Sequence, residues 1–103
     1  MPDKAQITAL ITLSDAVAEP KSAGVRSGFE AHHKFPEVDF LAGGFHSYGD
    51  DALHYPGEEL VARIAFPSWA YFGSTLKVGD AFEIYEHQRR IGRGVVQAIH
   101  APD

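Results

Sequence analysis

The sequence contains no cysteine among its 103 residues. This absence excludes disulfides, thiolate metal ligands and a cysteine nucleophile, and it favours a reducing compartment, because small secreted domains often depend on disulfides. Long apolar runs are also missing, since none approaches the roughly 20 residues that span a bilayer. Residues 1–13 lack the basic segment and the apolar stretch of a signal peptide. We therefore expect a cytoplasmic protein without membrane contact.

Positive charge is scarce in this chain. The 9 lysines and arginines are outnumbered by 14 aspartates and glutamates, which gives a formal net charge of −5 at pH 7 with histidine neutral. An acidic protein repels nucleic acid and anionic membranes at long range, so RNA binding is disfavoured. The 6 histidines are uncharged in this count. Their protonation is expected to make the surface charge depend on pH around pH 6.

A strong helical period of 3.6 residues is also missing, and the apolar residues alternate with a period of two instead. This alternation is typical of half-buried strands. It predicts six of them, at Gln6–Leu13, Phe29–Phe35, Val38–Ala42, Glu59–Phe66, Ala81–Glu86 and Ile91–Ile99. The phase of the alternation assigns seven side chains to the core, namely Ile7, Ile11, Leu60, Ile64, Phe82, Ile84 and Val95.

Turn-forming residues separate the predicted strands. They are Pro36, Gly43-Gly44, Pro56-Gly57, Pro67 and Gly79-Asp80. Longer loops are expected over residues 15–27 and 45–55, and Ser68–Thr75 is expected to hold a single helical turn. Residues 1–103 are thus predicted to form one all-β domain. Six short strands favour a sandwich or a closed barrel, because closure removes the exposed strand edges that promote aggregation.

The last two predicted strands carry a more specific pattern. From Gly79 to Val96 the residues follow G-x-x-F-x-I-x-E-x-x-R-x-[IV]-G-x-G-V-V, which is similar to the closing hairpin of the third domain of elongation factor Tu. Pro56-Gly57-Glu58 resembles the P-G-D turn of that family, and Arg26–Phe29 stands in the place of its K-G-Y segment. The resemblance spans nearly the whole chain, and it implies a stand-alone, six-stranded, closed Greek-key barrel.

The same resemblance implies a docking surface. In elongation factor Tu this domain takes part in binding the T-stem of aminoacyl-tRNA and the exchange factor. Ser27 and Glu30 stand where the family has basic residues, which weakens the case for tRNA here. The G-x-x-x-x-G-K-[ST] loop is absent, so we expect neither GTP hydrolysis nor a bound nucleotide.

Two patterns suggest chemistry, and neither meets its requirements. Gly44–Gly49 contains a histidine and a serine close to Asp50 and Asp51, but the serine lies one position too late for the G-x-S-x-G elbow. His32 and His33 are neighbours on an expected strand and point to opposite faces. The other histidines are scattered and do not form H-E-x-x-H. We therefore expect no catalytic residue, no metal site and no cofactor, with most histidines on the surface.

Two clusters are candidate partner-binding sites. Arg89, Arg90 and Arg93 form the densest basic cluster, which we place at the tip of the last hairpin. They suit a phosphate or an acidic partner; alternatively they are solvated charges balanced by Glu83 and Glu86.

The second cluster is aromatic. Trp69, Tyr71 and Phe72 lie between Pro67 and Gly79, in a connection longer than the family has. Aromatic side chains dominate the hot spots of protein interfaces. Alternatively, these three rings plug the open end of the barrel.

Our first hypothesis is a non-enzymatic protein-interaction module that binds another protein or a second copy of itself. The alternative is a translation-related RNA-binding barrel, which the resemblance and the arginine cluster favour and the net charge disfavours. A small enzyme or metal protein is the third possibility.

Overall fold

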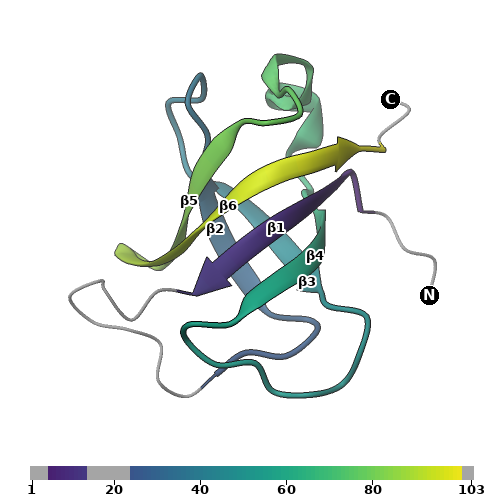
Figure 1. Cartoon of the computed structure of the whole chain (residues 1–103). Coiled ribbons are helices and arrows are strands. Elements are labelled where there is room, and N and C mark those ends of the chain that lie inside the picture. The colour runs from purple at the N-terminus through teal and green to yellow at the C-terminus, as the bar shows by residue number, and fades with distance from the viewer. Residues whose placement is uncertain (1–4, 14–23, 101–103) are drawn as a thin grey trace.

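The computed structural model describes residues 5–13 and 24–100, and these residues form mainly β-strands (Figure 1). The strands are β1 Ile7–Leu13, β2 Glu30–Lys34, β3 Ala42–Ser47, β4 Glu59–Ala65, β5 Ala81–Glu86 and β6 Arg89–Ile99. Two short 3₁₀ helices, η1 (Trp69–Tyr71) and η2 (Gly73–Thr75), lie between β4 and β5. The described ranges contain no α-helix, so the predicted all-β class is confirmed. No helix within them is long and apolar enough to cross a membrane.

The six strands close into one antiparallel barrel in the order β1-β4-β3-β2-β5-β6. Closure depends on β1, which pairs with β4 on one side and with β6 on the other (Figure 1). Strands β2, β3 and β4 are consecutive neighbours, and β1 lies beside β4, which is a Greek-key arrangement. The predicted six-stranded closed barrel is therefore confirmed.

The core lies inside the barrel and is built from every second strand residue. In β1, for example, Ile7, Ala9, Ile11 and Leu13 are buried, while the residues between them are partly exposed. Six of the seven predicted core residues are buried. The seventh prediction, Val95, is wrong, because its side chain is 42% exposed and its neighbour Val96 is buried instead.

The third strand begins later than predicted. Residues 36–41 form turns, bends and irregular backbone, and β3 runs from Ala42 to Ser47. The strand predicted at Val38–Ala42 is therefore wrong. Gly43-Gly44 is part of the strand rather than a turn, and residues 45–47 are not a loop. A β-carbon on Gly44 would lie 2.9 Å from side-chain atoms of Ile64 and Phe66. Close packing inside the barrel, rather than a turn, therefore explains why position 44 is glycine.

The same packing argument predicts the effect of adding a methyl group to β6. In Gly94→Ala the new carbon would lie 2.5 Å from the Phe82 ring and 2.9 Å from Ile11. Overpacking of this kind costs about 1–3 kcal/mol of unfolding free energy. Gly43→Ala is the matched control, because its new carbon meets nothing closer than 3.9 Å. Urea unfolding should show a loss for Gly94→Ala only, and equal losses in the two variants would contradict the packing.

Candidate functional site

Arg89 and Arg90 lie next to the turn of the β5–β6 hairpin, as predicted, but Arg93 lies further along β6 opposite Glu83, so its predicted place at the hairpin tip is wrong. Arg89 donates from Nη2 to Oε1 of Glu86 at 2.9 Å, and Arg90 donates from Nη1 to Oε2 of Glu83 at 3.1 Å. The hydroxyl of Tyr85 donates to the other oxygen of Glu83. The hydrogen bonds from Tyr85 and Arg90 lower the pKa of the Glu83 carboxyl. Two of the three arginines are thus paired with acidic residues of their own hairpin, as the alternative interpretation predicted.

Arg93 is in a different situation. Its register partner on β5 is Glu83, but both oxygens of that carboxylate are already bonded to Tyr85 and Arg90. Within residues 5–13 and 24–100, the exposed side chain of Arg93 has no hydrogen bond or ion pair. Its guanidinium is therefore available to an external anion.

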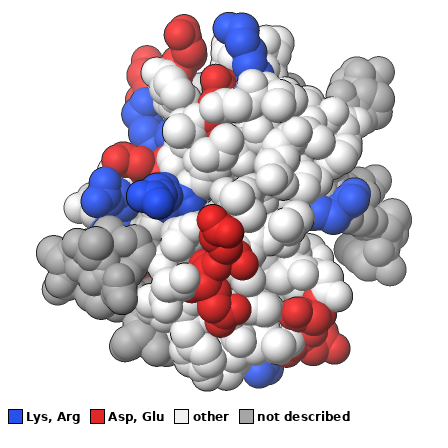
Figure 2. All heavy atoms as spheres, viewed as in Figure 1, with Lys and Arg blue, Asp and Glu red and all other residues white. Residues whose placement is uncertain are grey.

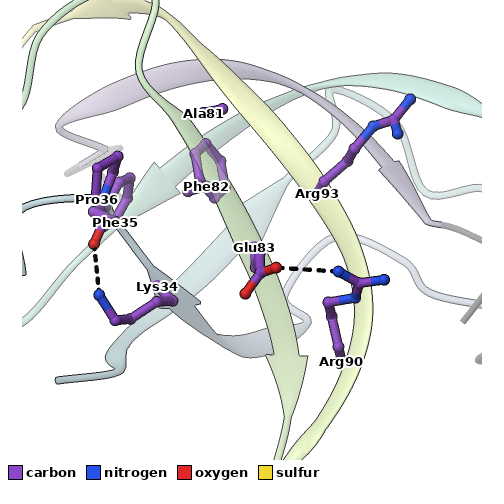
Figure 3. Close-up of a pocket in the computed structure, with 8 residues that line it drawn as sticks. All are labelled: Lys34, Phe35, Pro36, Ala81, Phe82, Glu83, Arg90 and Arg93. Carbon is purple, nitrogen blue, oxygen red and sulfur yellow. Dashed lines mark hydrogen bonds and ion pairs between the residues drawn. The ribbon is translucent and has the colours of Figure 1, made fainter. Parts of the chain in front are cut away.

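A groove of about 380 Å³ crosses β5 beside these arginines (Figure 3). It forms because the pairing of β2 with β5 ends at Lys34, and Pro36 has no amide to extend it. The floor of the groove is mainly apolar; the exposed residues Pro36 and Ala81 contribute to it, whereas Phe35 and Phe82 below them are only 1% and 3% exposed. Lys34 and Pro36 line one side, and Figure 3 shows the arginines on the other.

The groove is locally positive on an acidic protein. Lys34, Arg90 and Arg93 line it together with a single carboxylate, that of Glu83. The ammonium of Lys34 donates to the backbone carbonyls of Phe35 and Val38, which holds this charge at the edge of the groove. The arrangement combines an apolar floor with an excess of positive charge, so it suits an anionic ligand that also carries apolar groups.

The predicted aromatic segment closes one end of the barrel. Phe72 is 2% exposed and packs against Phe35 and Phe66, so it belongs to the core. Trp69 is partly buried and stacks on Phe66 with ring centroids 6.1 Å apart. Tyr71 is the exception, because it is 84% exposed. Two of the three rings plug the barrel end, and one ring is presented to solvent.

A chain of hydrogen bonds between histidines runs through the core, where the sequence led us to expect surface histidines. His33 on β2 and His46 on β3 are 0% and 2% exposed, and their Nε2 atoms lie 2.8 Å apart. Nδ1 of His33 is 2.8 Å from the carbonyl oxygen of Ala42, and Nδ1 of His46 is 2.8 Å from the hydroxyl of Tyr48. The expectation that most histidines lie at the surface agrees with the other four, and His33 and His46 are the two exceptions.

The groups at the two ends of the histidine hydrogen-bond chain determine which ring nitrogens carry protons. A carbonyl oxygen only accepts, so Nδ1 of His33 carries a proton, and its Nε2 is the acceptor when the ring is neutral. Nε2 of His46 must then donate to it, and Nδ1 of His46 accepts from the Tyr48 hydroxyl. The hydrogen bonds therefore run in one direction, from Tyr48 through both imidazoles to Ala42. Every ring nitrogen of the two histidines therefore has a hydrogen-bond partner while both rings remain neutral.

Burial holds the two imidazoles in this neutral state. Loss of hydration lowers the pKa of His33 to about 4, with a further contribution from His32 beside it on β2. Burial likewise lowers the pKa of His46 well below its ordinary value of 6.5, and so does His33. Burial raises the pKa of the Tyr48 hydroxyl, which therefore keeps the proton that it donates. Near it, His54 is bonded to Asp50 and Glu58, and these contacts raise the pKa of His54.

No group of three or more histidine, aspartate or glutamate side chains in the described part of the chain is placed to hold a metal ion. No protein-family model matches the sequence, and no curated protein matches it either.

The histidine chain predicts that acid destabilises the barrel. Unfolding frees two imidazoles that take up protons near pH 6.5, while in the folded state their pKa values are lowered. Because the folded-state values are the lower ones, the stabilisation is complete above about pH 6.5 and is lost as the pH falls toward 4. His33 alone accounts for a loss of up to about 3 kcal/mol, at about 1.36 kcal/mol per pKa unit.

Urea unfolding at a series of pH values measures this dependence. His32→Gln is the matched control, because it removes the neighbouring histidine that lies outside the core. It should keep most of the decline, since burial and not His32 is the largest cause of the lowered pKa of His33. An unfolding free energy that stays constant between about pH 6.5 and 4.5 would show that the imidazoles are not buried and neutral.

The hydrogen bond from Tyr48 to His46 leads to a second prediction. Tyr48→Phe removes the hydroxyl that donates to His46, which leaves a buried acceptor without a partner. Such a loss costs about 1–3 kcal/mol of unfolding free energy. Tyr85→Phe removes a hydroxyl that donates to the partly exposed Glu83, and its effect should be smaller. Chemical denaturation of the two variants compares them directly, and an equal or larger loss in Tyr85→Phe would contradict the buried hydrogen bond between Tyr48 and His46.

Proposed function

We propose that this barrel is a non-enzymatic protein-interaction module, and that the groove beside the β5–β6 hairpin binds an acidic, partly apolar segment of another protein. The observation that carries the proposal is the composition of the groove. Three cations and one carboxylate line an otherwise apolar groove, on a protein whose formal net charge is −5. Local positive charge on an acidic protein concentrates anionic ligands at one place.

The chemistry of the groove favours a peptide carboxylate as its anion. Arginine presents a planar fork that matches a carboxylate with two parallel hydrogen bonds, and Arg93 has no such partner in the described part of its own chain. The apolar floor would cover aliphatic side chains of the same segment, as in peptide grooves that combine both contacts. Tyr71 and Trp69 are expected to add contacts for a larger partner at the barrel end. The resemblance to the third domain of elongation factor Tu, which docks other macromolecules, agrees with this role.

The alternative, an RNA-binding barrel, has less support. The segment that resembles the K-G-Y segment of elongation factor Tu, Arg26–Phe29, lines a separate hollow with Leu53 and Glu86. That hollow has one cation and one carboxylate, so it offers little attraction for phosphates. RNA-binding barrels combine a basic groove with a platform of stacking aromatic rings. The arginine groove has two rings, and both belong largely to the core.

Peptide binding tests the proposal. A short, fluorescently labelled peptide that alternates glutamate and leucine should bind the wild-type protein, and a matched lysine–leucine peptide should not. Arg90→Gln removes one cation and frees the carboxylate of Glu83, so affinity for the acidic peptide should fall about tenfold, as for the loss of a charge-assisted hydrogen bond.

Arg26→Gln is the matched control, because Arg26 lines the other hollow. It removes the same charge and should leave the affinity for the acidic peptide unchanged. Equal affinity for the acidic and the basic peptide would contradict the proposal. Nanomolar binding of single-stranded RNA at physiological salt, reduced by either variant, would favour the RNA-binding alternative instead.

A further inference from the structure

The outer face of β4, β1 and β6 carries two rows of side chains that run across the strands. The register of β1 with its two neighbours places Glu59, Thr12 and Arg93 in one row. The next row, two residues along each strand, contains Val61, Leu10 and Val95. All six alternate with core residues and point away from the barrel interior.

The second row is apolar although it lies on the outer surface. Val61 is 55% exposed and Val95 is 42% exposed, and the partly exposed Leu10 lies between them. The three strands face the viewer in Figure 1, and the same view in Figure 2 shows an uncharged area beside a run of acidic side chains near the middle of this face. A depression lined by Leu10, Glu59 and Arg93, among others, lies where the two rows meet. Contiguous apolar surface with a charged rim is typical of protein contact sites.

The two charges of the first row lie on opposite sides of β1. Glu59 and Arg93 both flank Thr12, one from β4 and one from β6. In the part of the chain that the structure describes, neither side chain has an ion pair or hydrogen bond. The row therefore presents one negative and one positive group, symmetrically placed about a central strand.

We propose that this face binds the same face of a second copy of the chain, with a twofold axis that runs parallel to β1. Such an axis exchanges the two sides of β1. It therefore places Arg93 against Glu59 of the second copy, and Glu59 against Arg93 of the second copy. The apolar row is matched by the same operation, because Val61 meets Val95 of the second copy and Leu10 meets its own equivalent. Self-complementarity of this kind is the requirement for a twofold-symmetric interface.

A twofold axis perpendicular to β1 is the competing arrangement. It would place Glu59 against Arg63 of the second copy, because Arg63 lies in the row on the other side of Leu10. Arg63 already interacts within its own chain, whereas Arg93 has no such contact in the described residues. The perpendicular axis would also leave Arg93 without a carboxylate. The parallel axis satisfies both charges, and we assign the interface to it.

This inference goes beyond the proposed function and concerns a surface that shares Arg93 with the groove. Arg93 borders both surfaces, but Glu59 lies outside the groove and Arg90 lies outside the two rows. Variants at Glu59 therefore test self-association, and variants at Arg90 test peptide binding. Failure of one proposal can be distinguished from failure of the other.

Charge reversal tests the interface through a mixing experiment. Glu59→Arg alone places arginine against arginine in a pair of identical copies, and Arg93→Glu alone places glutamate against glutamate. Each variant should associate at least about tenfold more weakly than the wild type, because like charges at an interface repel. An equimolar mixture of the two variants should associate again, since both opposed pairs then have opposite charges.

Sedimentation velocity over a concentration series up to about the millimolar range measures all three samples. Glu30→Arg on β2 is the matched control, because it changes the net charge equally and lies away from the two rows; it should associate like the wild type. Circular dichroism melting verifies that each variant is folded. If Arg93→Glu does not fold, Val61→Arg replaces it as a single variant, and it should abolish association.

Three results would overturn the proposal. The first is a wild-type protein that stays monomeric throughout the series. The second is a wild type that associates while Glu59→Arg associates equally well. The third is a mixture of Glu59→Arg and Arg93→Glu that remains monomeric while Glu59→Arg mixed with Arg63→Glu associates, because that result would assign the perpendicular axis.

Discussion

The pairing of β1 on both of its edges is the constraint on which the rest of the structure depends. This strand bonds β4 through one edge and β6 through the other, and so converts a curved sheet into a closed barrel. Its inward residues are among the most buried in the molecule, and its outward residues join the rows of its two neighbours. Without this strand, β4 and β6 would become open edges, which promote aggregation. Closure, core packing and the outer face thus depend on one seven-residue segment.

Closure also determines where a function can lie. The interior of this barrel is filled by packed side chains, including two histidines that replace apolar residues because their hydrogen bonds are complete. Binding is therefore expected on the outside, at places where the regular pairing of strands ends or where a face stays apolar. The groove beside β5 arises where β2 ends at Lys34, and the two outer rows arise from the register of β1. Both candidate surfaces are consequences of the strand pairing.

Much of the fold could be predicted from the sequence, because alternating strands such as β1, β4 and β5 show their inward face directly. The prediction failed at β3, where Gly43-Gly44 resembles a turn although Gly44 is required by the Ile64 and Phe66 side chains behind it. It also failed at Val95, although the small residues Gly92 and Gly94 mark the inward face of β6 and place Val96 with them. The pairs of Arg89 and Arg90 with glutamates followed from hairpin register. The histidine chain did not, because His46 was assigned to a loop and its contact with His33 depends on the pairing of β2 with β3.

Hydrogen exchange of the β1 amides tests most directly whether closure through this strand holds the molecule together. The amides of β1 that bond to β4 and those that bond to β6 should exchange at the same slow rate, with an opening free energy equal to that of global unfolding. This result is expected if neither edge of β1 opens while the rest stays folded. Faster exchange of the β1 amides that bond to β6, while those that bond to β4 stay protected, would show that the barrel opens at the β1–β6 edge. That result would contradict the role of β1 in holding the barrel closed.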